Sequence, residues 1–440
     1  MKKAMKWGAV ALMTAMVMTG CSLDNNTDEP KLAICPVDSL WLTRSEQQLV
    51  AGSNDFAFRL FTQSIMSYGI ASPGGCMPPA GWSHNDSYSN KMLSPLSITF
   101  ALGMLNNGAA GETQAQINKV LGFGDTGADG INDFCRKILT AAPALDELTK
   151  VAIANTIFMN QGYELWPDFK AKAAQCYDAE PQTRNFNDGQ TMDVINQWAS
   201  DHTEKMIEKV VDEKSFNPAA VSYLLNAVYF KGTWANKFDE AETREEDFEH
   251  AGPDKNLLVL PMMHKMDRFS YMENDRCQAV QLPYGNGSYV MTVLLPAKGV
   301  DIYDLVSTMT ASTWQSDYLG KMRNTPVDLK LPRFETETSM ELSDILSFLG
   351  MPRAFSDVDA EFPRFCQVST YISKVLQSTH IKVNEEGTEA AAVTTVEEVN
   401  CEMAEPVRVE FHADRPFLYV ISEQATGAIF FIGQFTGLKS

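Results

Sequence analysis

The stretch from Val383 to Phe411 reads VNEEGTEAAAVTTVEEVNCEMAEPVRVEF. Its centre consists of small and β-branched residues, its flanks are acidic, and no proline occurs between Glu385 and Glu405. This composition is typical of a β-strand, because every backbone N–H group can join a ladder. The segment therefore predicts a strand, although no neighbouring stretch of sequence is ready to pair with it.

The composition of the whole chain bounds its class. The chain has 440 residues, of which 45% are hydrophobic and 21% charged, with a formal net charge of −20. These values are typical of a globular protein of one large domain or two to three ordinary ones. Nucleic acid is excluded as a partner, because binding to phosphates needs clustered cations and the chain has no long basic run.

The first residues are typical of an export signal. MKKAMKW is basic, GAVALMTAMVM is apolar, and MTGC follows. This pattern resembles the lipobox of bacterial lipoproteins, which implies a signal peptide over residues 1–20 and a lipid-anchored Cys21. Ser22 and the acidic residues after it suggest the outer membrane, with exposure at the cell surface. An ordinary secretory signal and a short anchor helix are the alternatives.

A polar tether is predicted over residues 21–50, because its first part, Ser22 to Pro30, is polar and acidic. Cysteines are scattered through the rest of the chain without a C-x-x-C pair, so metal-ligand spacing is absent. We interpret all of these except Cys401 as buried structural residues. The seven cysteines that follow Cys21 are Cys35, Cys76, Cys135, Cys176, Cys277, Cys366 and Cys401.

Apolar patterning predicts a mixture of helices and antiparallel strands, which is the α+β class. Helices are predicted at residues 54–66 behind an Asn54 cap, from Ser94–Pro95 to about Gly108, and at residues 339–351. Strands are predicted at residues 151–160, 220–234, 278–296 as a hairpin around Gly285–Gly287, and 415–435 as a pair. Residues 68–90 are rich in Pro, Gly and Ser and predict a surface insertion.

Motifs for catalysis are absent or fail their structural context. GFGDTG (residues 122–127) fits G-x-G-x-x-G, but a helical segment precedes it where a dinucleotide site needs a strand. The sequence has no G-x-S-x-G, H-E-x-x-H or Walker A motif, and its six histidines are isolated. We therefore predict that the chain is not an enzyme and has neither cofactor nor metal.

Six segments, taken in order, resemble the serpin family, and the resemblance covers about residues 50–440. They are NKMLSPLSITFALGMLNNGAAGET (residues 90–113), LLNAVYFKGTW (224–234), PMMHKMDRFSY (261–271), FETETSMELSDILSFLGM (334–351), NEEGTEAAAVTT (384–395) and FHADRPFLYVI (411–421). The fifth segment, which lies in the stretch quoted first, resembles the hinge of an inhibitory reactive-centre loop and is the most specific of the six.

The resemblance implies a serpin fold with three β-sheets, about nine helices and an exposed reactive-centre loop at about residues 385–412. The fold would occupy a single monomeric domain over residues 51–440. It also implies a sheet-opening region at Ser94, Ser97, Asn226 and Trp234. The hinge would comprise Glu385, Glu386, Gly387, Thr388, Glu389, Ala390, Ala391, Ala392, Val393 and Thr394. The missing partner of the predicted strand is then the central sheet of the protein itself.

The hinge composition suits a segment that lies first in water and later inside a sheet. Bulky apolar groups would make the exposed loop prone to aggregate, and charges or prolines would obstruct its insertion. Alanine and threonine avoid both problems, and Gly387 gives a flexible turning point. If Thr388 faces the core, strand alternation also turns the four small side chains at Ala390, Ala392, Thr394 and Val396 inward. The next inward residue, Glu398, departs from this pattern.

By resemblance to loops of ordinary length, the reactive bond is Cys401–Glu402, with Val399, Asn400 and Met403 as alternatives for its first residue. The expected function is irreversible suicide inhibition of a serine endopeptidase, through a covalent acyl-enzyme. Residues 385–405 contain no Lys or Arg, which favours an elastase-like or subtilisin-like target over a trypsin-like one. Papain-like proteases are secondary candidates. A cleaved substrate that traps nothing and a non-inhibitory binding protein are the alternative functions.

Overall fold

A capping box at Thr43 begins the first helix, α1 (Arg44–Ile65). The Thr43 hydroxyl accepts a hydrogen bond from the backbone of Glu46, whose carboxylate accepts one from the Thr43 N–H. Residues 44–50, which we expected in the tether, are therefore helical. The prediction that Asn54 caps a helix was wrong, because Asn54 is a buried residue within α1, where its side chain bonds the backbone of Gly427 and Ile429.

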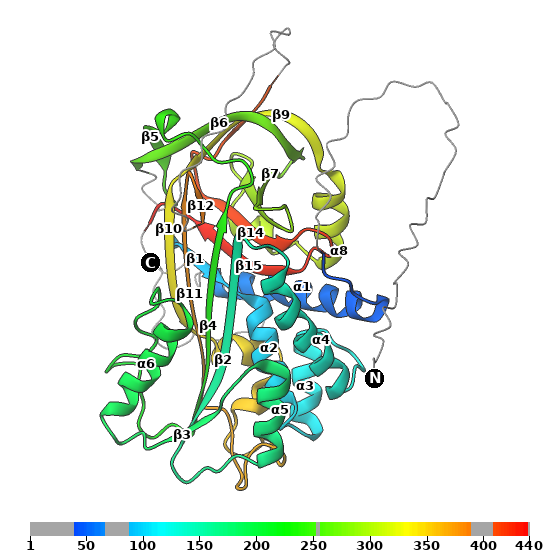
Figure 1. The fold of residues 1–440 in the computed structure, drawn as a ribbon, viewed down its shortest axis with the longest axis vertical. Helices are drawn as coiled ribbons and strands as arrows, with labels where there is room; N and C mark the ends of the chain where they lie inside the picture. Colours follow the sequence, from blue (N-terminus) through cyan, green and yellow to red (C-terminus); the bar gives the residue numbers. More distant parts are fainter. Residues whose placement is uncertain (1–38, 67–87, 252–255, 389–407, 439–440) are drawn as a thin grey trace, which may run out of the picture. The chain divides into compact units, whose positions relative to one another are not determined.

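The structure is a computed structural model that describes residues 39–66, 88–251, 256–388 and 408–438, all within the unit Cys35–Ser440 (Figure 1). Nine α-helices occur in these ranges, as the resemblance implied. After α1 they are α2 (Pro95–Asn106), α3 (Gly111–Leu121), α4 (Ala128–Ala141), α5 (Pro167–Tyr177), α6 (Gln190–His202), α7 (Ile302–Val306), α8 (Ala311–Thr313) and α9 (Ser343–Leu349).

A six-stranded sheet contains the longest predicted strands, in the spatial order β10-β11-β12-β4-β2-β3. Strand β4 pairs antiparallel with β2 on one side and parallel with β11 on the other. In chain order the strands are β2 (Thr149–Asn160), β3 (Gln182–Arg184), β4 (Ser222–Thr233), β10 (Phe334–Glu341), β11 (Lys374–Asn384) and β12 (Gly387–Thr388). We call this the central sheet.

Alternation along β4 assigns helices to the two faces of the central sheet. Tyr223 and Leu225 belong to a small cluster packed with residues from α6, whereas Leu224 and Val228 belong to the main core, which includes α2. Because successive side chains of a strand point to opposite faces, α6 covers one face and α2 the other. Asn226 has the same parity as Leu224, so it faces α2.

The remaining strands form a nine-stranded sheet in which β6 (Leu257–Glu273) changes partners along its length. Residues 257–262 pair with β5, residues 262–271 pair with β9, and residues 270–273 pair with β7. Two of the three predicted sheets are thereby joined into one in the described residues. The other strands are β1 (Lys91–Leu93), β5 (Arg244–Glu249), β7 (Cys277–Tyr284), β8 (Tyr289–Pro296), β9 (Arg323–Pro332), β13 (Val409–His412), β14 (Phe417–Glu423) and β15 (Ile429–Phe435).

Most predicted elements occur where the patterns indicated. The helix begins at Pro95, the hairpin at residues 277–296 turns at Gly285–Gly287, and β14 and β15 flank Thr426–Gly427. GFGDTG joins α3 to α4, so a helix precedes it, as predicted, and the stretch is a glycine-rich turn. The helix predicted at 339–351 was too long, because residues 339–341 extend β10 and only 343–349 are α-helical.

Four of the cysteines, Cys135, Cys176, Cys277 and Cys366, lie in the described ranges, where all are buried, as predicted, and none forms a disulfide bond. Cys21, Cys35, Cys76 and Cys401 lie outside those ranges, as does most of the predicted insertion. No helix in the described part of the chain combines the length and the apolar character that a membrane span needs.

Candidate functional site: the mouth of the central sheet

The hinge begins between two strands of the central sheet. Strand β12 consists of Gly387 and Thr388, and it pairs antiparallel with β11 on one side and with the end of β4 on the other. Further along, β11 and β4 pair directly with each other, over residues 374–380 and 223–229. The two strands are therefore separated only where β12 lies between them. We call residues 384–388 and their contacts the strand junction.

Gly387 is required at this point of the strand junction. Its φ angle is +146°, a region that L-residues rarely adopt. A Cβ atom there would overlap the carbonyl oxygen of Gly232 and come within 2.8 Å of the Thr233 Cα. Only glycine lets the chain turn from β11 into the space beside β4 at this distance.

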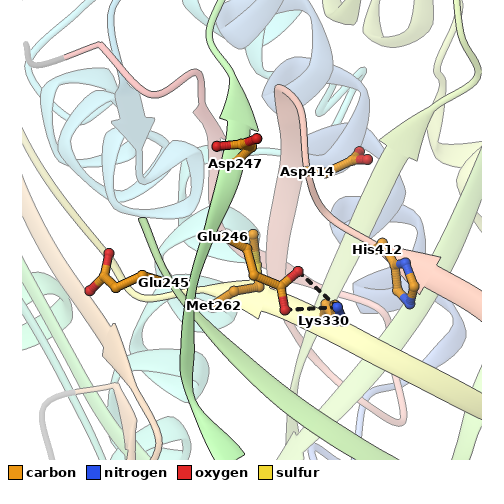
Figure 2. A pocket seen from close by; sticks show the side chains of 7 residues that line it. All are labelled: Glu245, Glu246, Asp247, Met262, Lys330, His412 and Asp414. Carbon is orange, nitrogen blue, oxygen red and sulfur yellow. Dashed lines mark hydrogen bonds and ion pairs between the residues drawn. The ribbon is translucent and has the colours of Figure 1, made fainter. Parts of the chain in front are cut away.

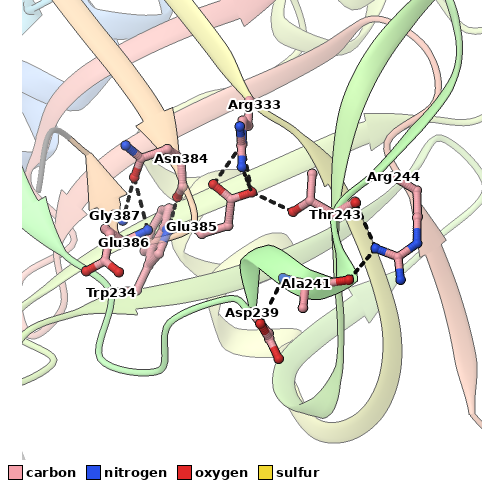
Figure 3. Close-up of polar contacts among 10 residues, drawn as sticks. All are labelled: Trp234, Asp239, Ala241, Thr243, Arg244, Arg333, Asn384, Glu385, Glu386 and Gly387. Atoms are coloured by element: carbon pink, nitrogen blue, oxygen red, sulfur yellow. Dashed lines mark hydrogen bonds and ion pairs between the residues drawn. The ribbon is translucent and has the colours of Figure 1, made fainter. Parts of the chain in front are cut away.

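Ion pairs fix the two residues before Gly387, and Figure 3 shows the one between Glu385 and Arg333. The Glu385 carboxylate is 2% exposed and accepts hydrogen bonds from Arg333 Nε at 2.7 and 2.8 Å and from Thr243 Oγ1 at 2.5 Å. Glu386 lies 2.5 Å from Lys237 Nζ. Two acidic residues of the predicted hinge are thus held by cations from outside the loop.

Two aromatic side chains pack against the strand junction. Trp234 is buried, its indole Nε1 donates to the carbonyl oxygen of Asn384 at 2.9 Å, and its ring stacks on Tyr284 at 4.4 Å. The Tyr284 hydroxyl is 2.8 Å from Thr388 Oγ1. Burial raises the pKa of Tyr284, so its hydroxyl stays protonated at physiological pH. Thr388 therefore faces the core, as the alternation of the predicted strand assumed. The other residues predicted to face inward lie outside the described residues.

The Glu385–Arg333 pair predicts an acid-sensitive strand junction. Burial raises the pKa of Glu385, but the hydrogen bonds from Arg333 and Thr243 outweigh burial and hold that pKa below its usual 4.5. A carboxyl with a depressed folded pKa stabilises the fold above its unfolded pKa, and this contribution is lost as pH falls through the folded value. Glu385→Gln is expected to cost roughly 1–3 kcal/mol at pH 7, and progressively less as the pH falls below 4.5.

Thermal unfolding of the parent and of Glu385→Gln between pH 3 and pH 7 measures this difference. Glu112→Gln, at an exposed position in the first turn of α3, is the control for a general charge effect. A gap between the melting temperatures of the parent and Glu385→Gln that stays constant across this range would contradict the prediction.

A polar bridge lies beneath β11 and β4, further from the strand junction. It consists of Ser94, Ser97, Asn155, Asn226 and Gln377, all buried. Gln377 Nε2 donates to Asn226 Oδ1 at 2.6 Å and to Ser97 Oγ at 3.0 Å. Asn226 Nδ2 in turn donates to Asn155 Oδ1 on β2 at 2.8 Å. The bridge therefore ties three adjacent strands to the start of α2.

Gln377 is the residue of the polar bridge with partners on both α2 and β4. Its Oε1 accepts from the Ser94 N–H at 2.9 Å, and its Nε2 also donates to the Ser94 carbonyl oxygen. Gln377→Met keeps the length of the side chain but removes these bonds, so we expect it to lower the free energy of unfolding by about 2–4 kcal/mol. It should also accelerate separation of β11 from β4.

Melting temperature and the rate of amide hydrogen exchange along β11 at 37 °C measure the two effects of Gln377→Met. Gln281→Met is the matched control, because Gln281 is also buried, in the nine-stranded sheet, but makes a single 3.3 Å side-chain hydrogen bond to Thr292. Equal losses of melting temperature in Gln377→Met and Gln281→Met would show that Gln377 contributes no more to stability than another buried glutamine.

The structure groups the predicted sheet-opening residues in two places. Ser94, Ser97 and Asn226 meet in the polar bridge, whereas Trp234 lies at the strand junction, eight residues or about 26 Å further along the chain of β4. Ser94 precedes α2, but its hydroxyl makes no capping bond. Sequence reasoning missed Gln377, Arg333, Thr243 and Tyr284. Glu389 to Thr394, Cys401, Glu402 and Cys21 lie outside the described residues.

An acidic hollow of about 440 Å³ lies on the nine-stranded sheet, beside β13 (Figure 2). Glu246 accepts hydrogen bonds from Lys330 at 2.7 and 2.8 Å, while Glu245, Asp247 and Asp414 contribute further carboxylates. Within the described ranges, no three His, Cys, Asp or Glu side chains are grouped so that they could hold a metal ion. The hollow makes the face beside the C-terminal end of the loop acidic.

A family model described as "Serpin (serine protease inhibitor)" matches residues 81–437. The chain therefore belongs to the serpin family, and this membership confirms the predicted fold class. That description is of a protease inhibitor and not of a catalyst, so the prediction that the chain is not an enzyme is confirmed as well.

Relatives and solved structures agree with the family assignment. Serpin B4 of Homo sapiens is 32% identical over 372 residues, which cover 79% of this chain and 93% of the relative. Serpin B6 of Macaca fascicularis is 30% identical over 356 residues, 80% and 94% of the two chains. The native thermophilic serpin tengpin matches with a TM-score of 0.78 at 27% identity, over 92% of this chain and 97% of tengpin.

Human thyroxine-binding globulin in complex with its ligand has the same fold, with a TM-score of 0.78 over 90% of this chain and 100% of the globulin, at 23% identity. The serpin fold therefore occurs both in inhibitors and in a hormone-binding protein. The family alone does not assign an inhibitory role to this chain, and the residues at the mouth of the central sheet must do so.

Proposed function

We propose that the protein is an irreversible suicide-substrate inhibitor of serine endopeptidases. The observation that carries this proposal is the position of β12, which holds Gly387 and Thr388 between β11 and β4. A loop that starts between two strands can continue between them once its far end is cut. The exposed alternative, a loop that leaves the sheet at its edge, would have no such path.

Insertion of the cut loop replaces one ladder of backbone hydrogen bonds by two. The direct pairing of β11 with β4 is parallel and spans residues 374–380 of β11. A strand entering from β12 would replace it by two antiparallel ladders, and antiparallel pairing is slightly more stable per residue. Small side chains at Ala390 and Ala392 would enter this space without displacing the core. About twelve inserted residues would span roughly 40 Å.

The chemical step begins as ordinary proteolysis. The protease serine Oγ attacks the carbonyl carbon of Cys401, an ester bond forms, and the Cys401–Glu402 peptide bond breaks. The proton taken from the serine is transferred to the leaving amine of Glu402. Insertion then carries the acylated protease along the sheet and distorts its oxyanion hole, so that water no longer hydrolyses the ester.

Target preference follows from the loop. Residues 385–405 contain no Lys or Arg, so a protease whose specificity pocket requires a cation has none to bind. Cysteine or valine at the cleaved position fits a small apolar pocket, as in elastase-like and subtilisin-like enzymes. Papain-like proteases are secondary targets, where a thioester would take the place of the ester.

Incubation of the mature protein with pancreatic elastase, subtilisin and trypsin tests the proposal. We expect an SDS-stable complex with elastase or subtilisin and none with trypsin, and mass spectrometry of the released C-terminal fragment to begin at Glu402. Complete cleavage without a complex would indicate a substrate-like serpin. Absence of both cleavage and complex would indicate a non-inhibitory binding protein.

We also propose that the protein is exported and anchored to the bacterial outer membrane through a lipid on Cys21. The basic, apolar and small-residue order of residues 1–21 supports this, and the polar segment after Cys21 gives the folded unit reach from the membrane. Mass spectrometry of the N-terminal peptide from membranes is expected to show diacylglycerol on Cys21. We expect the Cys21→Ala variant to be soluble and to inhibit as the parent does. Retention of this variant in the membrane fraction to the same extent as the parent would refute the anchor.

A further inference from the structure

The ladders at the strand junction fix where the next residue of the loop would lie in the central sheet. Thr388 pairs with Val383 on β11 and with Gly232 on β4. Both ladders are antiparallel, so one step forward along the loop is one step back along each flanking strand. A loop that continues in this register therefore places Glu389 between the residue before Val383 and the residue before Gly232.

Lysines occupy both of these positions, Lys382 on β11 and Lys231 on β4. Thr388 faces the core, so alternation along the strands assigns the two lysines, and Glu389 in an inserted loop, to the opposite face of the sheet. The burial agrees, because Lys382 is exposed and Lys231 half-buried, whereas the residues on either side of Lys382 are buried. A carboxylate in the inserted strand would therefore have a cation on each side.

The two lysines disfavour closure of the sheet at this level in the intact protein. Direct parallel pairing of β11 with β4 ends at His380 and Tyr229, two residues before the lysines. Continued in the same register, the pairing would set Lys382 directly opposite Lys231. Like charges at opposed positions destabilise a pair of strands, so this row is better occupied by a third strand of opposite charge.

Carboxylates of the intact protein leave the charge of the two lysines largely uncompensated. Lys382 Nζ lies 3.6 Å from the nearer Glu335 oxygen, and both side chains are more than half exposed, so solvent weakens this pair. Lys231 has no ion-pair partner among the described residues. Its cross-strand neighbour Lys150 is itself paired with Glu204. An incoming carboxylate would thus neutralise charge that the intact protein does not.

The other outward carboxylate of the loop meets a lysine in the same register. Counting on from Glu389 places Glu397 opposite Lys374 of β11, whose Nζ donates to the Ser215 carbonyl oxygen at 3.1 Å. The outward residues between the two glutamates are uncharged. A shift by one residue would turn both carboxylates toward the core, so charge complementarity favours the register that β12 begins.

We propose that Lys231 and Lys382 bind the carboxylate of Glu389 as the cut loop enters the central sheet, and that this contact sets the register of insertion. The inference rests on the proposed function, because it concerns the same movement of the loop. The two lysines are positioning residues, since they contact neither the protease nor the cleaved bond. A carboxylate between them replaces a repulsion by two attractions, which favours the first step of insertion.

Exchange of the charges tests this contact. Glu389→Lys would place three cations in one row and is expected to raise the stoichiometry of elastase inhibition about threefold or more. Glu389→Lys/Lys382→Glu restores an opposite pair and should return to within about twofold of the parent. Glu389→Lys/Lys119→Glu is the matched control, because Lys119 is an exposed residue of α3, and it should keep the full defect. About 1 M NaCl should reduce the difference between the parent and Glu389→Lys, because salt screens exposed charges.

Melting temperatures of the loop-cleaved proteins separate this inference from the proposed function. Cleaved Glu389→Lys is expected to melt at least about 3 °C below the cleaved parent, while the two intact proteins melt together. An equal rise on cleavage in both proteins, or a charge exchange that restores no more than the Lys119→Glu control, would overturn the inference and leave insertion standing. A parent that gains no stability on cleavage would overturn the proposed function as well.

Discussion

Thr388→Arg is expected to convert the protein from an inhibitor into a substrate. Thr388 is fully buried between β11 and β4, with its hydroxyl 2.8 Å from that of Tyr284. An arginine at this position would place an unpaired charge in the core, which costs several kcal/mol, so β12 would leave the sheet instead. The cut loop would then have no start inside the sheet, and water would hydrolyse the acyl-enzyme first.

The measurement is the number of inhibitor molecules consumed per molecule of elastase or subtilisin inactivated. We expect this stoichiometry to rise at least tenfold in Thr388→Arg, with full cleavage of the loop and loss of the SDS-stable complex. Thr388→Val is the matched control, because it keeps the volume and loses only the hydrogen bond to Tyr284. A low stoichiometry in Thr388→Arg would show that β12 is not the starting point of insertion.

Cleavage of the loop is the second change with a large expected effect. Proteolysis between residues 389 and 407 normally destabilises a protein or leaves it unchanged, because it adds a chain end. Here we expect the melting temperature to rise by about 10 °C or more, since insertion adds backbone hydrogen bonds along both sides of a new central strand, each contributing roughly 0.5–1.5 kcal/mol.

Differential scanning calorimetry before and after a limited digest measures the rise. The cleaved Thr388→Arg variant is the control, because its loop is cut at the same bond but is expected to stay outside the sheet. An unchanged melting temperature in the cleaved parent would show that the intact protein stores no energy. A complex formed without this gain in stability would need another trapping mechanism.

Strands and turns were predicted well because their signals are local. The sequences of β2 and β4 are rich in apolar, β-branched and aromatic residues, and Gly285 and Gly287 mark the hairpin turn. The start of α1 was missed although Thr43 and Glu46 carry the spacing of a capping box. That signal lies before the apolar pattern on which the prediction relied.

The partners at the mouth of the central sheet could not be predicted, because they are distant in the chain. Glu385 and Arg333 are 52 residues apart, and the sequence gives no reason to join them. Gln377 is different, since it occupies an inward position in a strand whose other inward residues include Val375, Ile381 and Val383. A lone amide on that face was a readable signal for the polar bridge.

We expect the short parallel contact between β11 and β4 to limit how long the intact protein stays active. This contact and the polar bridge beneath it help to hold β11 and β4 together beyond β12, and thermal fluctuations separate the two strands at some rate even when no enzyme is present. Each molecule that ages in this way becomes inert without ever meeting a target. Potency of a stored sample should therefore decay as a single exponential whose half-life shortens steeply on warming.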